Sequence, residues 1–306
     1  PLLGHYSNRD DAIVERHLQW SQQYGIDNWI CSWWGPNSWE NKTILDYVSP
    51  NLEGSKVSYC LFYEAAGLLN MQNGRIEFDE QRTATFREHL KFIAANYFND
   101  PAYYRINGRP VVYIYLTRTF AGDYKNAISA ARQDVAEMGF DIFLIGDEVY
   151  WGSPNFTRIA ALDGITAYNM HGPHEYDGYP MDTHFFDKVA EKYTAFRNIA
   201  NLTNTAFIPK IMPGFNDRGV RLSADHYVIP SQVHPDSNHT STFEHYSHLA
   251  EAFIDPNLNA LCITSFNEWH EDTQIEPTIM TDATSFDVSS EQVYTKGYDY
   301  TGYGMA

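Results

Sequence analysis

The stretch VVYIYLTRTFAGDYKNAISAARQDVAEMGFDIFLI, residues 111–145, contains one complete strand–helix–strand unit. Two short apolar runs, residues 111–116 and 142–145, flank a helical segment over residues 123–138. Gly139 follows that segment, at the position where a glycine commonly ends a helix. A helix between two short apolar strands is the usual connection between parallel strands. The unit therefore predicts an α/β fold with a parallel sheet.

The same alternation extends over most of the chain. Strand candidates occupy residues 26–32, 57–63, 111–116, 142–145, 165–168, 207–212 and 261–265. Helix candidates occupy residues 10–23, 78–98, 123–138, 182–201 and 242–254. We predict a TIM-like (β/α)₈ barrel that forms a single catalytic domain over residues 1–306, because such barrels need about 250 residues.

The barrel prediction leaves one strand unaccounted for. The strand candidates number seven, whereas a closed barrel of this type has eight. The deficit falls at the N-terminus, because the segment before the helix at residues 10–23 is too short to hold a strand. Either the first strand is missing from this chain or the barrel is open there. A doubly wound sheet remains the alternative fold.

Composition argues against a nucleic-acid partner, a membrane span and a zinc site at the cysteines. The chain has 39 acidic and 21 basic residues, a net charge of −18. We therefore expect no nucleic-acid partner, because an acidic protein repels phosphates. No apolar run reaches the roughly 18 residues of a membrane span. Cys31, Cys60 and Cys262 lie in apolar strand candidates and fit no zinc spacing, so we expect buried free thiols.

Polar and aromatic residues follow the strand candidates, where barrel enzymes place their catalytic groups. These residues are Trp33 and Trp34, Glu64, Tyr115, Asp147 and Glu148, Tyr168 and Asn169, Asn216 and Asp217, and Asn267 to Glu271. Aromatic residues make up 15% of the chain, which suits a protein that packs rings against sugars and equally suits an aromatic core.

The richest of these segments is SFNEWHE, residues 265–271. Glu268 and Glu271 are three residues apart, so one helical turn lets both face the same side. Two such acids are the usual equipment of glycoside hydrolysis, in which one protonates the leaving oxygen and the other acts as base or nucleophile. His270 is placed to tune a carboxylate, and a solvated acidic loop is the alternative interpretation. No paired-ligand spacing predicts a metal, so we expect none.

Several segments together resemble glycoside hydrolase family 99. They are GHYSNRD (residues 4–10), ICSWWG (30–35), RPVVYIY (109–115), MPGFND (212–217), SFNEWHE (265–271) and TQIE (273–276). The resemblance covers most of the chain, and its last motif is the most specific. It implies a (β/α)₈ barrel with endo-α-mannosidase or endo-α-1,2-mannanase activity, retention of configuration, and no metal or organic cofactor.

The resemblance also implies roles for individual residues. Glu268 matches the base that deprotonates the substrate's own 2-hydroxyl, which then forms a 1,2-anhydro sugar. Glu271 matches the acid that protonates the leaving oxygen and then activates water. Trp34 matches a sugar-stacking residue. The full expected substrate-binding set is Trp33, Trp34, Glu64, Tyr115, Tyr168, Asn267 and His270.

Two further expectations follow from the same resemblance. Asp272 stands where the family usually has glycine, so this turn carries one more negative charge. The expected partner is an oligosaccharide or polysaccharide, and the expected location is secreted or periplasmic, although the chain shows no targeting segment. A carbohydrate-binding or biosynthesis-associated barrel without hydrolysis is the alternative function.

Overall fold

A computed structural model describes residues 1–169, 184–217, 229, 231 and 241–279 of the chain. Within these residues the secondary structure is mixed α/β, and the main sheet is parallel. No helix of the described part is long and apolar enough to cross a membrane. Part of the long segment 213–241 that follows a strand candidate lies outside the described residues.

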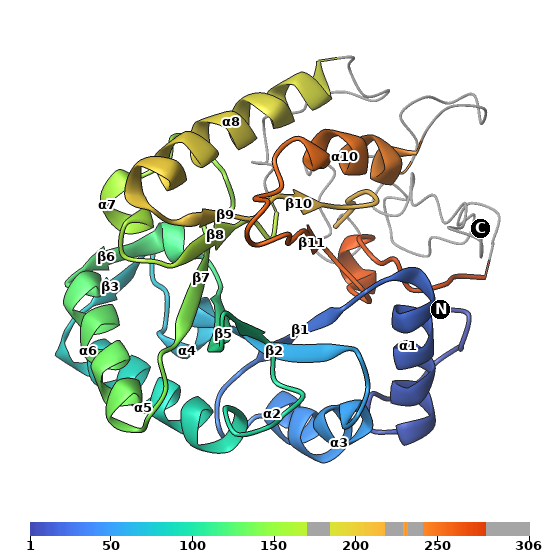
Figure 1. Cartoon of the computed structure of the whole chain (residues 1–306), viewed down its shortest axis with the longest axis horizontal. Helices are drawn as coiled ribbons and strands as arrows, with labels where there is room; N and C mark the ends of the chain where they lie inside the picture. The colour runs from blue at the N-terminus through green and yellow to red at the C-terminus, as the bar shows by residue number, and fades with distance from the viewer. Residues whose placement is uncertain (170–183, 218–228, 230, 232–240, 280–306) are drawn as a thin grey trace, which may run out of the picture.

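Neighbouring strands of the main sheet follow one another in chain order. The path runs through β1 (Asn28–Trp33), β2 (Ser58–Tyr63), β5 (Arg109–Ile114), β7 (Phe143–Asp147), β8 (Gly164–Thr166) and β9 (Ala206–Phe207). Every one of these pairings is parallel. A doubly wound sheet would reverse its strand order at a switch point. The unbroken order therefore excludes that alternative and matches the wall of a TIM-like barrel (Figure 1).

The wall continues from β9 into a second parallel pair. The backbone N–H of Ile208 donates to Ile165 at 2.9 Å, and that of Cys262 donates to Pro209 at 3.0 Å. Between these bonds β10 (Lys210–Ile211) pairs with β11 (Cys262–Ile263). All the strand candidates from the sequence are thus strands, and the predicted run at residues 207–212 is split into β9 and β10.

In the described residues no strand closes the wall between β11 and β1. Loop contacts span this opening instead. The N–H of Leu2 donates to Pro277 at 2.7 Å. The ring of Phe266, after β11, lies 6.5 Å from Trp29 of β1 and 5.0 Å from His17. Within the described residues the wall is therefore open between β11 and β1, the place where the sequence lacked a strand candidate.

Helices form an outer ring around the strands (Figure 1). The long ones are α1 (Asp11–Tyr24), α5 (Glu80–Tyr97), α6 (Tyr124–Glu137), α8 (Phe185–Thr203) and α10 (Thr242–Glu251). Each matches a predicted segment, and local signals explain their ends. In α1, Asp10 accepts the N–H of Ala12 at the start, and Gly25 ends the helix at φ 74°. In α5, Phe86, Leu90 and Ile93 form the buried face.

Several short helices and strands were not predicted from the sequence. The short helices are α2 (Trp39–Thr43), η1 (Ile44–Val48), α3 (Ser49–Leu52), α4 (Ala65–Leu68), η2 (Thr117–Thr119), α7 (Phe156–Ile159) and η3 (Trp269–Glu271). The short strands are β3 (Ile76–Phe78) and β6 (Phe120–Gly122), which pair in parallel, and β4 (Arg105–Ile106), which pairs with β5. The hairpin of β4 and β5 turns at Asn107 and Gly108, both at positive φ, so this Asn-Gly pair was a usable signal.

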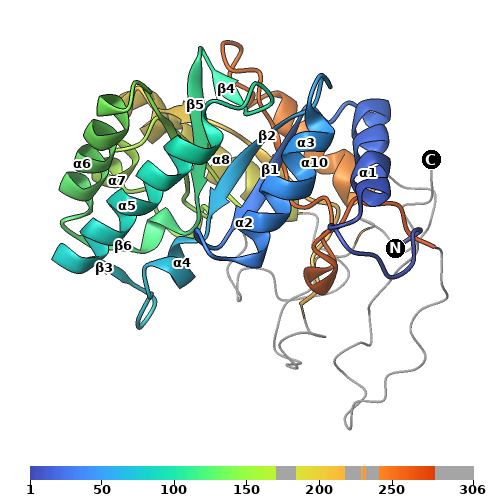
Figure 2. The ribbon, with the colours of Figure 1, turned by 90° about the horizontal axis from the view of Figure 1, so that it is seen from below.

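The two ends of the barrel carry different elements. In Figure 2 the β4 hairpin lies at the upper end, whereas α4, β3 and β6 lie at the lower end. The short orange-red turn of η3 lies at this same lower end. Since α4 follows β2 and η3 follows β11, the lower end is the carboxyl-terminal face of the parallel strands.

The cysteines are unpaired, as the sequence predicted. Cys60 and Cys262 are buried, whereas Cys31 is partly exposed.

Candidate active site

The carboxyl ends of neighbouring strands bring several predicted site residues together. Alternation along each strand points Ser32 and Glu64 into the barrel mouth, where the Ser32 hydroxyl donates to Glu64 Oε1 at 2.6 Å. Tyr115 follows β5 and Tyr168 follows β8, and their ring centroids lie 5.9 Å apart. Phe62 of β2 lies beneath both rings, at 5.4 Å and 5.9 Å.

Glu64 is nearly buried, with an exposed fraction of 9%. Burial raises the pKa of its carboxyl to about 7, against the hydrogen bond from Ser32 and with help from the nearby Asp147 charge. Glu64 therefore changes protonation near neutral pH, so it can accept or donate a hydrogen bond to a sugar hydroxyl.

Trp34 stands beside this carboxyl at the edge of the mouth. Its indole N–H donates to the Ser32 hydroxyl at 2.9 Å, and its side chain remains 47% exposed. Gly67 of α4 lies against the edge of the ring, where an added Cβ would come within 2.6 Å of Cζ3. The missing side chain at Gly67 thus leaves room for the ring, and the exposed part of Trp34 is available to a ligand.

The loop that carries the two glutamates is held by its own hydrogen bonds. Glu268 caps η3, because its carboxylate accepts the N–H of His270 at 2.9 Å. The N–H of Glu268 in turn donates to the Ser265 hydroxyl at 2.8 Å. The turn ends at Asp272, which has φ 53° and ψ 37°. This left-handed conformation explains why the related motif usually has glycine at this position.

A buried carboxylate, Glu276, clamps this loop to the N-terminal segment. It accepts a hydrogen bond from the Tyr6 hydroxyl at 2.6 Å and another from the indole N–H of Trp269 at 3.0 Å. His17 of α1 lies 3.3 Å from its other oxygen. Asn267 also donates to the Tyr6 hydroxyl, at 3.3 Å. Residues on both sides of Glu268 and Glu271 are therefore anchored.

Tyr168, after β8, lies within electrostatic range of both glutamates. Burial raises the pKa of Tyr168 well above its usual value, and the charges of Glu271, Glu268 and Glu64 raise it further. The N–H of Asn216 donates to the backbone carbonyl of Glu271 at 2.8 Å, so the segment after β10 also supports this turn.

Two buried charged residues, Asp147 and Lys210, act on the carboxylates of the mouth through their charges. Asp147, at the end of β7, is completely buried and accepts the backbone N–H groups of Tyr168, Val149 and Leu116. Burial raises the pKa of Asp147 to about 7 against these three bonds. Lys210 of β10 is also completely buried, and its ammonium interacts with the charges of Asp147 and Glu271.

The predicted residues differ in their environments. His270 is 82% exposed in its side chain and lies 3.4 Å from Glu268. Trp33 points the other way from Ser32, into the helical layer. It is completely buried, stacks on Tyr63 at 5.8 Å and donates to Asn41 of α2. We remove Trp33 from the candidate sugar-binding residues, because a side chain without exposed surface cannot touch a ligand.

Some residues of the site were not found from the sequence. Lys210 had one signal, a lysine inside the apolar run at residues 207–212. Ser32 had no signal, because its role depends on the strand register that brings it to Glu64. Tyr6 and Glu276 are 270 positions apart, so no local pattern links them.

No metal site is formed in the described part of the chain: no group of three or more His, Cys, Asp or Glu side chains is arranged to hold an ion. A surface hollow of about 400 Å³ lies elsewhere, between α6 and α7. Its lining includes Lys125, Arg132 and Phe156 but no carboxylate, so it lacks the acids that the predicted chemistry needs.

Known proteins resemble this chain over most of its length. A family model described as "Glycosyl hydrolase family 99" matches residues 1–299. A "Glycoprotein endo-alpha-1,2-mannosidase" of Mus musculus is 25% identical over 287 residues, which are 91% of this chain and 56% of that protein. A "Glycoprotein endo-alpha-1,2-mannosidase-like protein" of Homo sapiens is 25% identical over 288 residues, with 91% and 57% covered. The chain thus spans just over half the length of these relatives.

Solved structures share the fold. A "Glycoside hydrolase-like protein" has a TM-score of 0.75 at 19% identity, with 97% of this chain and 87% of that chain covered. A GH99 endo-alpha-mannosidase from Bacteroides thetaiotaomicron has a TM-score of 0.63 at 22% identity, with 94% and 79% covered.

Proposed function

Because the chain belongs to glycosyl hydrolase family 99, we propose that it is a retaining, endo-acting glycoside hydrolase that cleaves α-mannosidic linkages. Two curated relatives are endo-alpha-1,2-mannosidases by name, which supports an α-1,2-linked mannan as substrate. The observation that carries the proposal is the anchored loop 265–276, which keeps Glu268 and Glu271 on one turn at the open barrel mouth.

The proposed reaction has two steps, and Glu268 and Glu271 transfer the protons in both. Glu268 takes the proton of the sugar's 2-hydroxyl, and the freed oxygen attacks the anomeric carbon. The glycosidic bond breaks, and Glu271 donates its proton to the leaving oxygen. A 1,2-anhydro sugar results. In the second step Glu271 takes a proton from water, whose oxygen attacks the anomeric carbon. The three-membered ring opens, and Glu268 returns its proton to the 2-oxygen. Two inversions give net retention.

Other residues of the mouth bind the glycan in this proposal. Trp34 stacks on a sugar ring, and Glu64, Tyr115 and Tyr168 hold hydroxyl groups in the sugar beside the bond to be cleaved. His270 lies 3.4 Å from Glu268 and sets its orientation toward the 2-hydroxyl, and Asn267, held by the Tyr6 hydroxyl, binds the glycan beside it. A polymeric α-mannan is met outside the cytosol, so we include a secreted or periplasmic site of action, which fractionation of the source cells would test.

Substitution of each glutamate tests the division of labour. Glu268→Gln should abolish turnover of every substrate, because no other group deprotonates the 2-hydroxyl. Glu271→Gln should lose less on an α-mannosyl fluoride than on α-mannan, because fluoride needs little protonation as it departs. Initial rates on both substrates give the comparison. Equal losses for the two variants on the fluoride would contradict the assigned roles.

A 2-fluoro sugar tests the anhydro intermediate itself. A 2-deoxy-2-fluoro α-mannosyl donor has no 2-hydroxyl and should be inert with the unaltered enzyme. A conventional nucleophile would instead form a stable ester with it. Mass spectrometry of the intact protein separates the two. An adduct on either glutamate would overturn the anhydro-sugar mechanism and leave hydrolysis standing, whereas inactivity on every α-mannan tried would overturn hydrolysis.

A further inference from the structure

A second exposed tryptophan stands near the mouth. Trp39 is the first residue of α2, five positions after Trp34, and 66% of its surface is exposed. The described residues leave few large apolar side chains this exposed. The loop after β1 therefore has an exposed indole at each end.

Arg9 covers one face of the Trp39 ring. Its guanidinium carbon lies 3.6 Å from the ring centroid, which is close cation–π contact. The Arg9 Nε donates to the Thr43 hydroxyl at 3.0 Å, and that hydroxyl donates to the backbone carbonyl of Trp39 at 2.9 Å. Arg9 thus holds the Trp39 indole in place from one side. The exposed surface of Trp39 is the part of the side chain that the guanidinium does not cover.

The loop between the two tryptophans is also rigidly held. Ser38 caps α2 by accepting the N–H of Asn41 at 3.0 Å. The Asn41 side chain donates to Pro36 at 2.9 Å and accepts from the buried Trp33 indole at 2.8 Å. An aromatic side chain fixed before binding stacks on a ligand without losing much conformational entropy.

Trp39 is connected to the catalytic loop as well as to Trp34. Tyr6 accepts the hydrogen bond from Asn267, the neighbour of Glu268, and Arg9 is three residues further along the same segment. Three residues span at most about 10 Å. The Trp39 indole is therefore linked through Arg9 and the N-terminal segment to the residue beside Glu268, on the side of the barrel where β1 and the N-terminal segment meet.

We propose that Trp39, backed by Arg9, is an outer sugar-binding subsite that stacks on a neutral pyranose of the bound glycan beyond the sugars held at the cleavage point. The inference rests on the proposed function, because it takes the glycan to run from Glu268 past Trp34. A neutral sugar fits the surroundings, since Glu40 and Asp10 add negative charge close to Arg9. One indole suits the C–H face of a single sugar, whereas a stable protein partner would need roughly 800 Å² on each side.

Binding measured against chain length tests the subsite. The parent is Glu271→Gln, which keeps the chain from consuming the ligand, and the probes are α-1,2-linked manno-oligosaccharides of increasing length in a calorimeter. The affinity of the parent should rise with length until the sugar reaches Trp39. Trp39→Ala in the parent should lose about three- to tenfold on the longest probes and less on the shortest, whereas Trp39→Tyr should keep most of the rise.

A matched control comes from another exposed aromatic residue. Phe156 is 54% exposed on α7, after β7, three strands away from β1 around the wall. Phe156→Ala should bind every probe as the parent does. If Trp39→Ala matches the parent at all lengths while the parent binds, the subsite is overturned and the proposed function stands. If the parent binds no α-mannan probe, the proposed substrate falls, and the subsite falls with it.

Discussion

Lys210 shows how strongly the barrel interior perturbs a single residue. It is completely buried, and its ammonium nitrogen has no hydrogen-bond partner among the described residues. Burial lowers the pKa of Lys210 from 10.5 to about 7, although Asp147 and Glu271 oppose the change. Between these values the unfolded chain binds a proton that the folded protein does not. The free energy of unfolding should therefore rise with pH over this window, by about 4–5 kcal/mol at most.

Lys210→Met should remove that pH dependence. The variant lacks the amine whose pKa burial lowers, so the rise in the free energy of unfolding above pH 7 disappears. Urea unfolding at pH 7 and 9.5 measures the slope. Lys125→Met, on the exposed face of α6, is the control and should keep the rise. A slope in Lys210→Met as steep as in the unaltered protein would contradict the prediction.

Asp272 occupies a backbone conformation that few residues tolerate. Its φ of 53° is left-handed, and its carboxylate accepts from Gln274 at 3.2 Å. Asp272→Val should cost about 1–2 kcal/mol, because a β-branched side chain is strained there. Asp272→Gly should stay within about 0.5 kcal/mol, since the gain in backbone freedom offsets the lost hydrogen bond. Thermal unfolding of both variants checks this, and equal melting temperatures would refute the strain argument.

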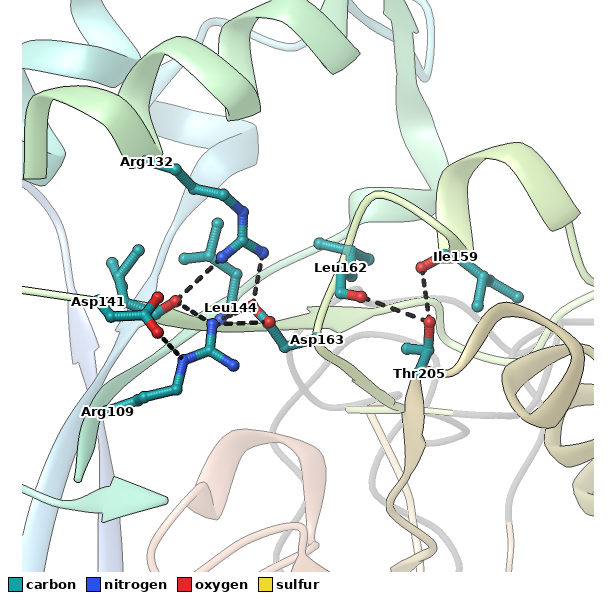
Figure 3. A network of polar contacts seen from close by, with 9 residues as sticks. Arg109, Arg132, Asp141, Leu144, Ile159, Leu162, Asp163 and Thr205 are labelled. Carbon is teal, nitrogen blue, oxygen red and sulfur yellow. Dashed lines mark hydrogen bonds and ion pairs between the residues drawn. The ribbon is translucent and has the colours of Figure 1, made fainter. Parts of the chain in front are cut away.

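At the scale of elements, one carboxylate joins four segments on the face opposite the candidate site. Asp163, just before β8, lies 2.7 Å from Arg109 of β5 and 2.5 Å from Arg132 of α6, and it accepts the N–H of Leu144 in β7 at 2.9 Å (Figure 3). Both arginines also donate to the carbonyl of Ile142. Figure 3 also shows Thr205, the residue before β9, whose hydroxyl donates hydrogen bonds to the backbone carbonyls of Ile159 and Leu162.

Removal of this carboxylate should destabilise the fold without touching the catalytic face. Asp163→Ala removes the carboxylate that neutralises two partly buried guanidinium groups, which keep only the Ile142 carbonyl and the exposed Asp141, and it takes the acceptor from the Leu144 N–H, at a cost of about 2–4 kcal/mol. Asp141→Ala is the matched control, because Asp141 pairs with Arg109 at 3.0 Å but is 77% exposed, and it should cost less than about 1 kcal/mol. Chemical denaturation compares them. Similar losses for the two variants would mean that the network does not join these elements.

At the scale of the whole molecule, the negative net charge affects which polymers the protein can bind. With a net charge of −18 we expect no appreciable affinity for duplex DNA at about physiological salt. A neutral mannan carries no charge, so its binding should change little with salt. Fluorescence anisotropy with a labelled duplex, and mannan binding at two salt concentrations, test both statements. Submicromolar binding to DNA would reveal a basic surface that the composition conceals.

The sequence by itself determined the architecture, and it predicts where the chemistry takes place. The helix and strand candidates depend on residues close together in the chain, so local patterns predicted them. The motif around Glu268 could be recognised for the same reason. The Asn107–Gly108 turn shows that part of what was missed was also local.

Only the tertiary structure decided which side chains meet. Trp33 and Ser32 are neighbours in the sequence, yet strand alternation sends one into the helical layer and the other into the mouth. Glu276 accepts a hydrogen bond from Tyr6, near the other end of the chain. The environment of Lys210 likewise depends on strands that lie far apart in the sequence. Hydrogen bonds and burial act over a few ångströms in space, whereas sequence patterns report only neighbours along the chain, so these contacts exist only once the barrel wall is assembled.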